Sequence, residues 1–382
     1  MRWYSHAGTL VLLLLLTACE DPSTVGLGIV GGEGGEPQLS DVPFTEFTVL
    51  EDEGIRDNSS RVLAGQVEDP VLGAVRAEGY LDFRNNVTLP PNYVSGTVET
   101  VLLQLQPEYL YGDTLTPVTF GLHEVMTEFA GRASTLDSIP EVGPELLQFT
   151  FMPTDSLVLA TLPSDWVASK DSIFQVLDFD NLFHGFQLNP ISGNAVVGFS
   201  NLITSQTMLR SVVDTDTVSF AGTRSITQYL RSGTPDLGDS FIPVQNGAGP
   251  KLRVQFDLDQ FAGRSLNRIA LQIQVDTTFY SQTPNFVRPE VRDLSMVGIA
   301  NEGEQEILLG IGLIIDGSII FDSANFRAIM QTVLLGADNF EHFEIRFPVS
   351  TTTGNTMDSA LFYGFADEAR QPRLLVTTTL LD

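Results

Sequence analysis

Short stretches of alternating or continuous apolar residues recur along the chain, and Gly, Pro, Asn or Asp bounds each of them. A period of two and an enrichment in β-branched and aromatic residues are typical of β-strands. The clearest predicted strands are residues 97–105, 118–125, 252–258, 268–275 and 374–380. Their spacing favours antiparallel β-sandwiches over a parallel α/β sheet.

One stretch has the period of a helix instead. The pattern predicts a helix over residues 323–337, with Ser323 as a candidate N-cap. The apolar positions at i, i+3, i+4, i+7 and i+8 are Phe326, Ile329, Met330, Val333 and Leu334. This apolar stripe is interpreted as core packing, with a partner site as the alternative.

Two pairs of motifs indicate an internal repeat. GYLDF at residues 79–83 corresponds to LRVQF at 252–256, 173 positions later, and FHGF at 183–186 corresponds to FYGF at 362–365, 179 positions later. We therefore expect two tandem antiparallel β-sandwich domains, jelly-roll-like, with one short helix. The boundary should fall in the Gly- and Pro-rich residues 233–250.

The first nineteen residues have the layout of a bacterial lipoprotein leader. Arg2 precedes an apolar run, and Leu16, Thr17 and Ala18 precede the only cysteine of the chain, Cys19. This lipobox predicts cleavage before Cys19 and lipid on its sulfur and amine. The apolar run is too short for a membrane-spanning helix, and lipidation would leave no thiol for a disulfide.

The domain prediction follows from these patterns. It assigns residues 1–18 to a signal peptide, 19–43 to a flexible Gly-rich and acidic tether, 44–235 to the first sandwich and 236–382 to the second. The tether contains Gly26, Gly28 and Gly31, which match G-x-G-x-x-G. Without a preceding strand and a following helix the match is interpreted as linker, so no dinucleotide is expected.

The charge balance excludes some partners. The chain has 20 Lys+Arg against 48 Asp+Glu, a formal net charge of −28. Nucleic-acid binding depends on neutralising phosphates, so no nucleic-acid partner is expected. Direct docking on anionic lipid is equally disfavoured, so membrane attachment should depend on the N-terminal lipid.

Aromatic residues supply the candidate binding site. Trp166, Tyr109 and Tyr111 could form a platform on which sugar rings stack, because these side chains combine a flat apolar face with a polar group. The alternative is that the three rings serve in core or edge packing.

The sequence offers little metal or catalytic chemistry. Weak calcium candidates are Asp178, Asp180, Asp214 and Asp216, whose alternative role is in solvated turns. No clustered His or Cys ligands suit zinc, and no Gly-x-Ser-x-Gly elbow accompanies a histidine. We therefore expect no cofactor, no metal and no enzymatic activity, with a hydrolase built on an unrecognised carboxylate pair as a minor alternative.

Several motifs resemble known families. The lipobox with the acidic pair after it, GQVEDPVLG at residues 65–73, FHGFQL at 183–188 and QNGAG at 245–249 resemble Bacteroidota lipoproteins of domain-of-unknown-function family forty-two-seventy. The β-repeat and QPRLLV at 371–376 resemble DNRLRE-type sandwich modules of surface proteins. The first resemblance implies an outer-membrane location and no known activity, and the second makes glycan or matrix contact more plausible.

The expected function is a lipid-anchored envelope protein with a structural, adhesive or ligand-presenting role. The alternative is a glycan-binding accessory lipoprotein in polysaccharide capture. The acidic pair after Cys19 resembles a surface-export tag, so we expect the outer membrane and its cell-surface face, with the periplasmic face as the alternative. Partners would be a membrane through the lipid, and a glycan or another envelope protein.

Overall fold

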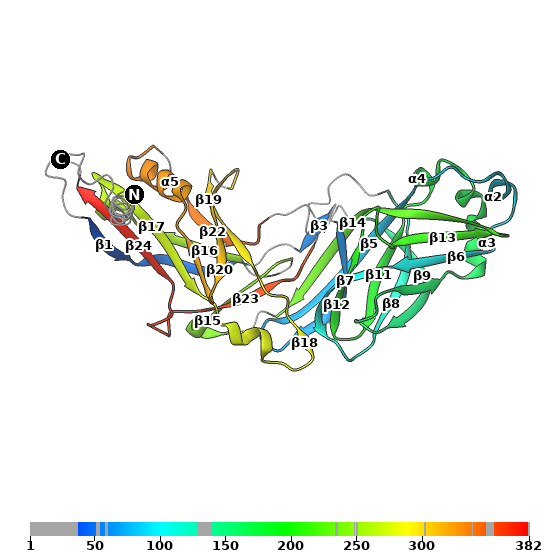
Figure 1. The fold of residues 1–382 in the computed structure, drawn as a ribbon, viewed down its shortest axis with the longest axis horizontal. Coiled ribbons are helices and arrows are strands. Elements are labelled where there is room, and N and C mark those ends of the chain that lie inside the picture. Colours follow the sequence, from blue (N-terminus) through cyan, green and yellow to red (C-terminus); the bar gives the residue numbers. More distant parts are fainter. Residues whose placement is uncertain are drawn as a thin grey trace, which may run out of the picture.

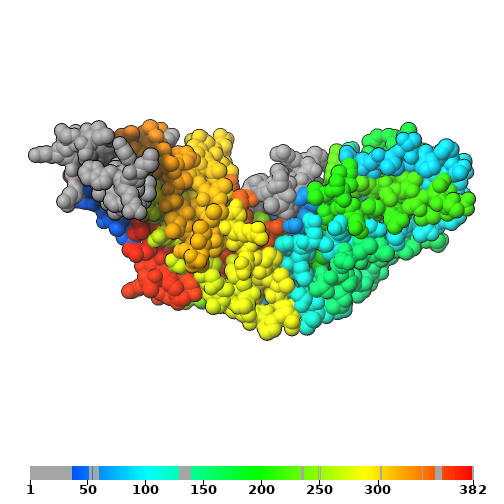
Figure 2. Space-filling model, in the orientation of Figure 1, coloured from blue at the N-terminus to red at the C-terminus, as the bar shows by residue number. Residues whose placement is uncertain are grey.

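The computed structural model confirms a mainly β protein. It describes residues 37–50, 54–57, 60–128, 139–233, 236–247, 249, 251–301, 303–337, 339–348 and 355–380. The predicted signal peptide, the lipobox and Cys19 lie outside the described residues. Two β-rich units lie at opposite ends of an elongated molecule (Figure 1), and Figure 2 shows them as two lobes.

The first unit comprises twelve strands and three short helices. The strands are β3 (Ile55–Asp57), β4 (Arg61–Asp69), β5 (Gly73–Asn85), β6 (Thr100–Leu105), β7 (Pro107–Asp113), β8 (Val118–Val125), β9 (Val142–Phe151), β10 (Val158–Thr161), β11 (Phe186–Ser192), β12 (Ala195–Ser200), β13 (Met208–Val213) and β14 (Asp216–Ser232). Helices α2 (Pro91–Ser95), α3 (Ser164–Phe174) and α4 (Phe179–Leu182) lie at its outer end (Figure 1). The core between its layers is rich in phenylalanine.

The second unit combines the C-terminal strands with two from the N-terminus. The strands are β1 (Gln38–Val42), β2 (Phe44–Leu50), β15 (Phe241–Gln245), β16 (Lys251–Phe256), β17 (Arg264–Gln274), β18 (Phe286–Val287), β19 (Asp293–Ala300), β20 (Gln305–Ile315), β21 (Ser318–Phe321), β22 (His342–Arg346), β23 (Ser359–Tyr363) and β24 (Arg373–Leu380). Nine strands follow the continuous order β1-β24-β17-β21-β20-β19-β22-β16-β2. The strands from β1 to β21 form one sheet, those from β19 to β2 form the other, and β20 pairs with both β21 and β19. The β20–β21 turn joins them on one side.

The predicted helix is confirmed in the second unit. Helix α5 (Ala324–Leu334) begins after Ser323, whose hydroxyl accepts a hydrogen bond from the Phe326 N–H at 3.0 Å. Phe326 and Met330 are buried in the core of this unit, which makes the apolar stripe core packing. The expectation of one helix is wrong, because the described part of the chain contains four short helices.

The N-terminal strands correct two predicted domain boundaries. β1 pairs with β24, and β2 pairs with β16, so one segment closes the free edges of both sheets of the second unit. Pro43 separates the two strands, and the chain bends there from one sheet to the other. The flexible tether therefore does not extend to residue 43, and residues 44–50 belong to the second sandwich.

The two units share one pattern of strand pairing. In the first unit β6 lies between β10 and β13, and β11 lies between β5 and β8. In the second unit β17 lies between β21 and β24, and β22 lies between β16 and β19. β14 pairs with β13 and β5 in the first unit, whereas β1 pairs with β24 and β2 pairs with β16 in the second. β1 and β2 together thus take the position of β14.

This pattern supports one repeat motif and corrects the other. β5 and β16 are equivalent, and Leu81 and Val254 oppose Phe186 and Phe343 in the two equivalent pairs, at the predicted separation of 173 positions. The second motif pair is wrong, because Phe186 lies on β11 whereas its predicted counterpart Phe365 lies beyond the end of β23, which pairs with β15. Sequence similarity between short β motifs does not ensure equivalent positions in a sheet.

A buried ion pair joins the two units. Asp69 at the end of β4 accepts hydrogen bonds from Arg288, from Nε at 2.8 Å and from Nη2 at 3.1 Å. Both residues are nearly inaccessible, with exposed fractions of 3% and 4%. The guanidinium lies 4.7 Å from the ring centroids of both Phe279 and Phe286. Tyr111 donates a further hydrogen bond to Asp69 at 2.6 Å.

Backbone pairing and apolar contacts extend this interface. β18 of the second unit adds to the edge of β7 in the first unit. Phe286 and Met357 join an apolar cluster whose other members belong to the first unit. Arg61 donates a hydrogen bond to the Asn355 carbonyl oxygen at 3.1 Å. The polar groups buried in these contacts have hydrogen-bond partners in the other unit, so the two units are held in one arrangement.

Removing one charge of this pair should destabilise the protein strongly. Asp69→Asn leaves the buried Arg288 without its counter-ion, and we expect a loss of about 3 kcal/mol in the free energy of unfolding. The matched control is Asp322→Asn, which breaks the exposed pair with Arg268 and should cost less than about 1 kcal/mol. Urea denaturation measures both. Equal losses would show that the buried pair does not hold the interface.

The same pair predicts a pH dependence. Burial alone would raise the pKa of Asp69, but hydrogen bonds from Arg288 and Tyr111 outweigh it and lower the pKa below its ordinary value. A carboxylate with a lowered pKa in the folded state stabilises the fold above its unfolded pKa, and this stability is lost as the pH falls through the folded pKa. Stability should therefore drop more steeply below about pH 4 in the wild type than in Asp69→Asn.

Candidate functional site

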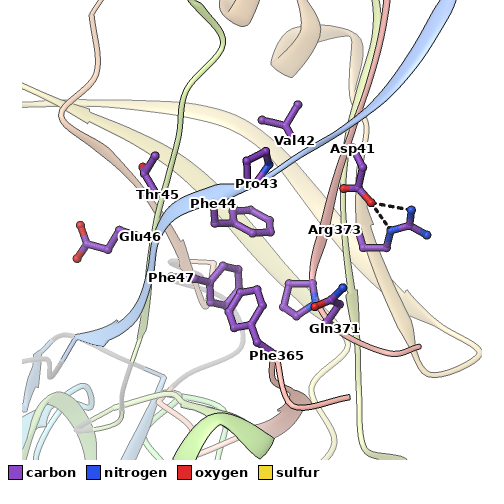
Figure 3. Close-up of a pocket in the computed structure, with 11 residues that line it drawn as sticks. Asp41, Val42, Pro43, Phe44, Thr45, Glu46, Phe47, Phe365, Gln371 and Arg373 are labelled. Carbon is purple, nitrogen blue, oxygen red and sulfur yellow. Dashed lines mark hydrogen bonds and ion pairs between the residues drawn. The ribbon is translucent and has the colours of Figure 1, made fainter. Parts of the chain in front are cut away.

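A pocket of about 510 Å³ opens at the bend between β1 and β2. Its lining is formed by residues 41–47, Phe365 and residues 371–373 (Figure 3). The volume lies in the range of small-molecule sites, which are commonly concave and mostly apolar. The pocket thus lies where the N-terminal strands meet the loop that precedes β24.

Three phenylalanine rings form the apolar part of the pocket. The rings of Phe44 and Phe47 are 5.1 Å apart between centroids, and Phe365 lies 6.1 Å from Phe44 and 5.4 Å from Phe47. All three contacts are edge-to-face, the geometry that aromatic rings favour. Phe365 is 40% exposed, so its ring offers accessible apolar surface to a ligand.

Local backbone geometry places these rings. Glu46 opposes Gln255 and Phe44 opposes Phe256, so the register shifts by one residue at Thr45. This bulge lets both Phe44 and Phe47 pack against the core although they are three positions apart. Gly364 precedes Phe365, and a Cβ there would lie 2.2 Å from the Asp239 carbonyl oxygen, so only glycine permits this close approach.

Paired charges surround the rings. Asp41 accepts hydrogen bonds from Arg373, from Nε at 2.7 Å and from Nη2 at 2.6 Å, as Figure 3 shows. Glu46 lies 3.5 Å from Arg253. The lining consists of Asp, Val, Pro, Phe, Thr, Glu, Gln and Arg, without His, Cys or Lys. An apolar floor with polar groups at the rim is suited to holding a ligand.

The structure places Trp166 in the core. It lies on α3, is 8% exposed, and its ring contacts Phe174, Phe183 and Phe186. Its indole N–H donates to Glu124 at 2.8 Å, which satisfies the one polar group of the ring. The stacking platform predicted for Trp166 is therefore wrong, because the ring is buried among phenylalanine rings and is not available to a sugar.

Tyr109 and Tyr111 lie on β7 at the interface between the units, away from Trp166. Tyr111 is fully buried beside the ion pair of Asp69. The Tyr109 hydroxyl donates to Asp358 at 3.1 Å and accepts from the Met357 N–H at 2.8 Å. These rings bind the second unit instead of a sugar, so the predicted shared platform is wrong.

The pocket residues were not among the predicted site residues. A signal was present in the sequence, since two phenylalanines, Phe44 and Phe47, follow Pro43 just after the predicted tether ends. Phe365 belongs to the motif FYGF, which predicted a repeat and no binding site. Which distant loop meets the N-terminal strands depends on the β1–β24 pairing, and local patterns do not predict that pairing.

The acidic residues proposed for calcium serve turns and helix ends. Asp178 accepts from the Asn181 side chain at 2.6 Å, and Asp180 accepts from the Asn85 N–H at 2.8 Å. Asp214 has a φ of 55° in the turn between β13 and β14, and Asp216 begins β14. Within the described ranges, no group of three or more His, Cys, Asp or Glu side chains could hold a metal ion.

The predicted lipidation site cannot be placed in the structure, because Cys19 lies outside the described residues. In the part of the chain that is described, no helix is long and apolar enough to span a bilayer. Compared with known proteins, the chain matches no family model, no curated protein and no solved structure. The family resemblance inferred from the sequence stays a prediction.

Tryptophan fluorescence tests the placement of Trp166 directly. Trp3, the other tryptophan, lies in the predicted signal peptide, so the chain from residue 20 onward reports Trp166 alone. We expect blue-shifted emission and weak quenching by acrylamide, because the ring is buried. Added glycans should leave the emission unchanged. Emission typical of a water-exposed indole would contradict this placement.

Asp82 on β5 predicts a second pH effect. Burial raises the pKa of Asp82 to about 7, although the Phe83 N–H and Arg224 oppose the rise. Between its unfolded and folded pKa values the folded state binds a proton that the unfolded state releases, so stability falls as the pH rises through this window. Asp82→Asn should therefore raise the melting temperature at about pH 8 and change it little at about pH 4. An equal shift at both values would contradict the raised pKa.

Proposed function

We propose that the protein is a lipid-anchored envelope protein with a structural, adhesive or ligand-presenting role. The observation that carries the proposal is the position of β1. The predicted lipidated tether leads directly into this strand, and β1 belongs to the second unit. The second unit would therefore lie nearest the membrane and the first unit farthest from it.

A fixed interface suits this role. The Asp69–Arg288 pair, the β18–β7 pairing and the contacts of Tyr109 join the units through buried polar groups and backbone hydrogen bonds. Two units joined in this way would act as a spacer, which would hold the outer end of the molecule in a fixed position relative to the anchor. The net charge of −28 would keep the body away from anionic lipid, so the tether would hold it without adsorption.

Replacing the predicted lipidated cysteine tests the anchor. Cys19→Ala should move the protein from the membrane fraction to the soluble fraction, because the thioether to lipid cannot form. Cell fractionation with immunoblotting measures the distribution, and mass spectrometry of the wild type should detect the lipid on Cys19. The matched control is Ser23→Ala in the same tether. A Cys19→Ala protein that stays in the membrane fraction would contradict the proposal.

Ligand capture is a second candidate function, and the aromatic pocket favours it. Phe44, Phe47 and Phe365 could hold an apolar ligand face, including the face of a sugar ring. This version of glycan binding does not involve Trp166, Tyr109 or Tyr111.

A glycan array with the chain from residue 20 onward tests ligand capture. Phe365→Ala should weaken any binding at the pocket about tenfold or more, because it removes accessible ring surface. Leu335→Ala is the control, since Leu335 is an exposed apolar residue at the C-cap of α5, outside the lining. The absence of glycan binding, together with a protein partner found by crosslinking, would reject glycan capture and favour the structural role.

A further inference from the structure

The second unit depends on a strand that is remote in sequence. In the first unit β14 follows β13 directly and covers both β13 and β5. The equivalent strands β24 and β16 are covered instead by β1 and β2 from the start of the body. The segment Gln38–Leu50 therefore occupies the position beside β24 and β16, called the slot below. The first unit fills the equivalent position with β14, which follows β13 in the sequence.

The segment is held in this slot by apolar side chains. Val42 is 2% exposed and belongs to the core of the second unit. Phe44, Phe47 and Val49 pack against the same core. Five residue pairs join β1 to β24 and six join β2 to β16, so the segment contributes backbone pairing to both sheets.

Charge complementarity adds to this binding. Asp41 pairs with Arg373, and Glu46 lies 3.5 Å from Arg253. At the start of β1, Arg264 donates a hydrogen bond to the Gln38 side chain at 2.8 Å. Three arginines of the body thus meet three polar side chains of the segment. In a chain with so few cations, this arrangement gives the slot specificity for this acidic strand.

We propose that Gln38–Leu50 acts as a donor strand, which the second unit binds as it would bind a peptide ligand. Binding by strand addition obtains affinity from main-chain hydrogen bonds and specificity from side-chain pockets. The segment would therefore remain bound to the body after the chain is cut between β2 and β3. On the anchor proposed above, on which this consequence rests, such a cut would not release the body from the membrane.

A cleavage experiment on the chain from residue 20 onward tests the donor strand without the lipid. A flexible insert with a protease recognition sequence is placed between Asp52 and Glu53, and the protein is cut under native conditions. A denaturing gel measures cutting, and size-exclusion chromatography measures whether the fragments stay together. We expect the short fragment to elute with the body. A short fragment that separates from a folded body would overturn the proposal.

Two substitutions in β1 form a matched pair for the same experiment. Val42→Asp places a charge in the core, and the cut fragment should then dissociate about tenfold faster or more. Leu39→Asp changes a residue that is 69% exposed, and the cut fragment should be retained as in the wild type. Equal retention in both variants would overturn the proposed role of the apolar contacts.

A synthetic peptide keeps the test valid if Val42→Asp prevents folding. A fluorescent peptide of residues 38–50 is added in excess to the cut wild-type protein, and its fluorescence anisotropy is followed. We expect the peptide to replace the bound fragment and its anisotropy to rise, whereas a peptide with Val42→Asp should leave the anisotropy unchanged. A wild-type peptide whose anisotropy stays unchanged, even after a long incubation in which the cut fragment has dissociated from the body, would overturn the proposal. Because no lipid takes part, these outcomes are independent of the anchor.

Discussion

The outer strand of a sheet leaves one row of backbone groups without a strand partner, and in the second unit one bent segment covers β24 in one sheet and β16 in the other. β1 completes one sheet and β2 completes the other, with Pro43 at the change of direction. Uncovered edges would expose hydrogen-bonding groups and invite pairing with other chains. The segment next to the predicted anchor is thus part of the core, which links attachment to folding.

The interface between the units uses a different stabilising device. Asp69 and Arg288 are buried together, and their mutual hydrogen bonds compensate for the loss of hydration. Phe279 and Phe286 enclose the guanidinium, so the cation also gains contact with two aromatic faces. Tyr111, a residue with the chemistry of a sugar-binding site, completes this interior contact. Its surroundings, and not its residue type, decide its role.

Local patterns predicted the β class, helix α5 and the equivalence of β5 with β16, because alternation, helical period and capping are properties of neighbouring residues. They did not predict the partner of β1, since pairing between residues 38–42 and 374–378 depends on the whole chain. Nor did alternation reveal which face is covered, so Trp166 suggested a platform although α3 packs its ring inward. The glycine-rich start of the predicted tether concealed β1 for a similar reason. Composition describes the predicted tether as a whole, whereas β1 is formed by the last few residues of that tether.

The aromatic pocket and the closure of the second unit both involve the segment Gln38–Leu50, to which the predicted tether would join the proposed anchor. Amide hydrogen exchange followed by mass spectrometry measures most directly whether this segment is part of the fold. The account predicts that peptides covering Gln38–Leu50 exchange as slowly as peptides from their partners β24 and β16. Exchange of this segment at the rate of an unstructured chain, while β24 and β16 stay protected, would contradict it.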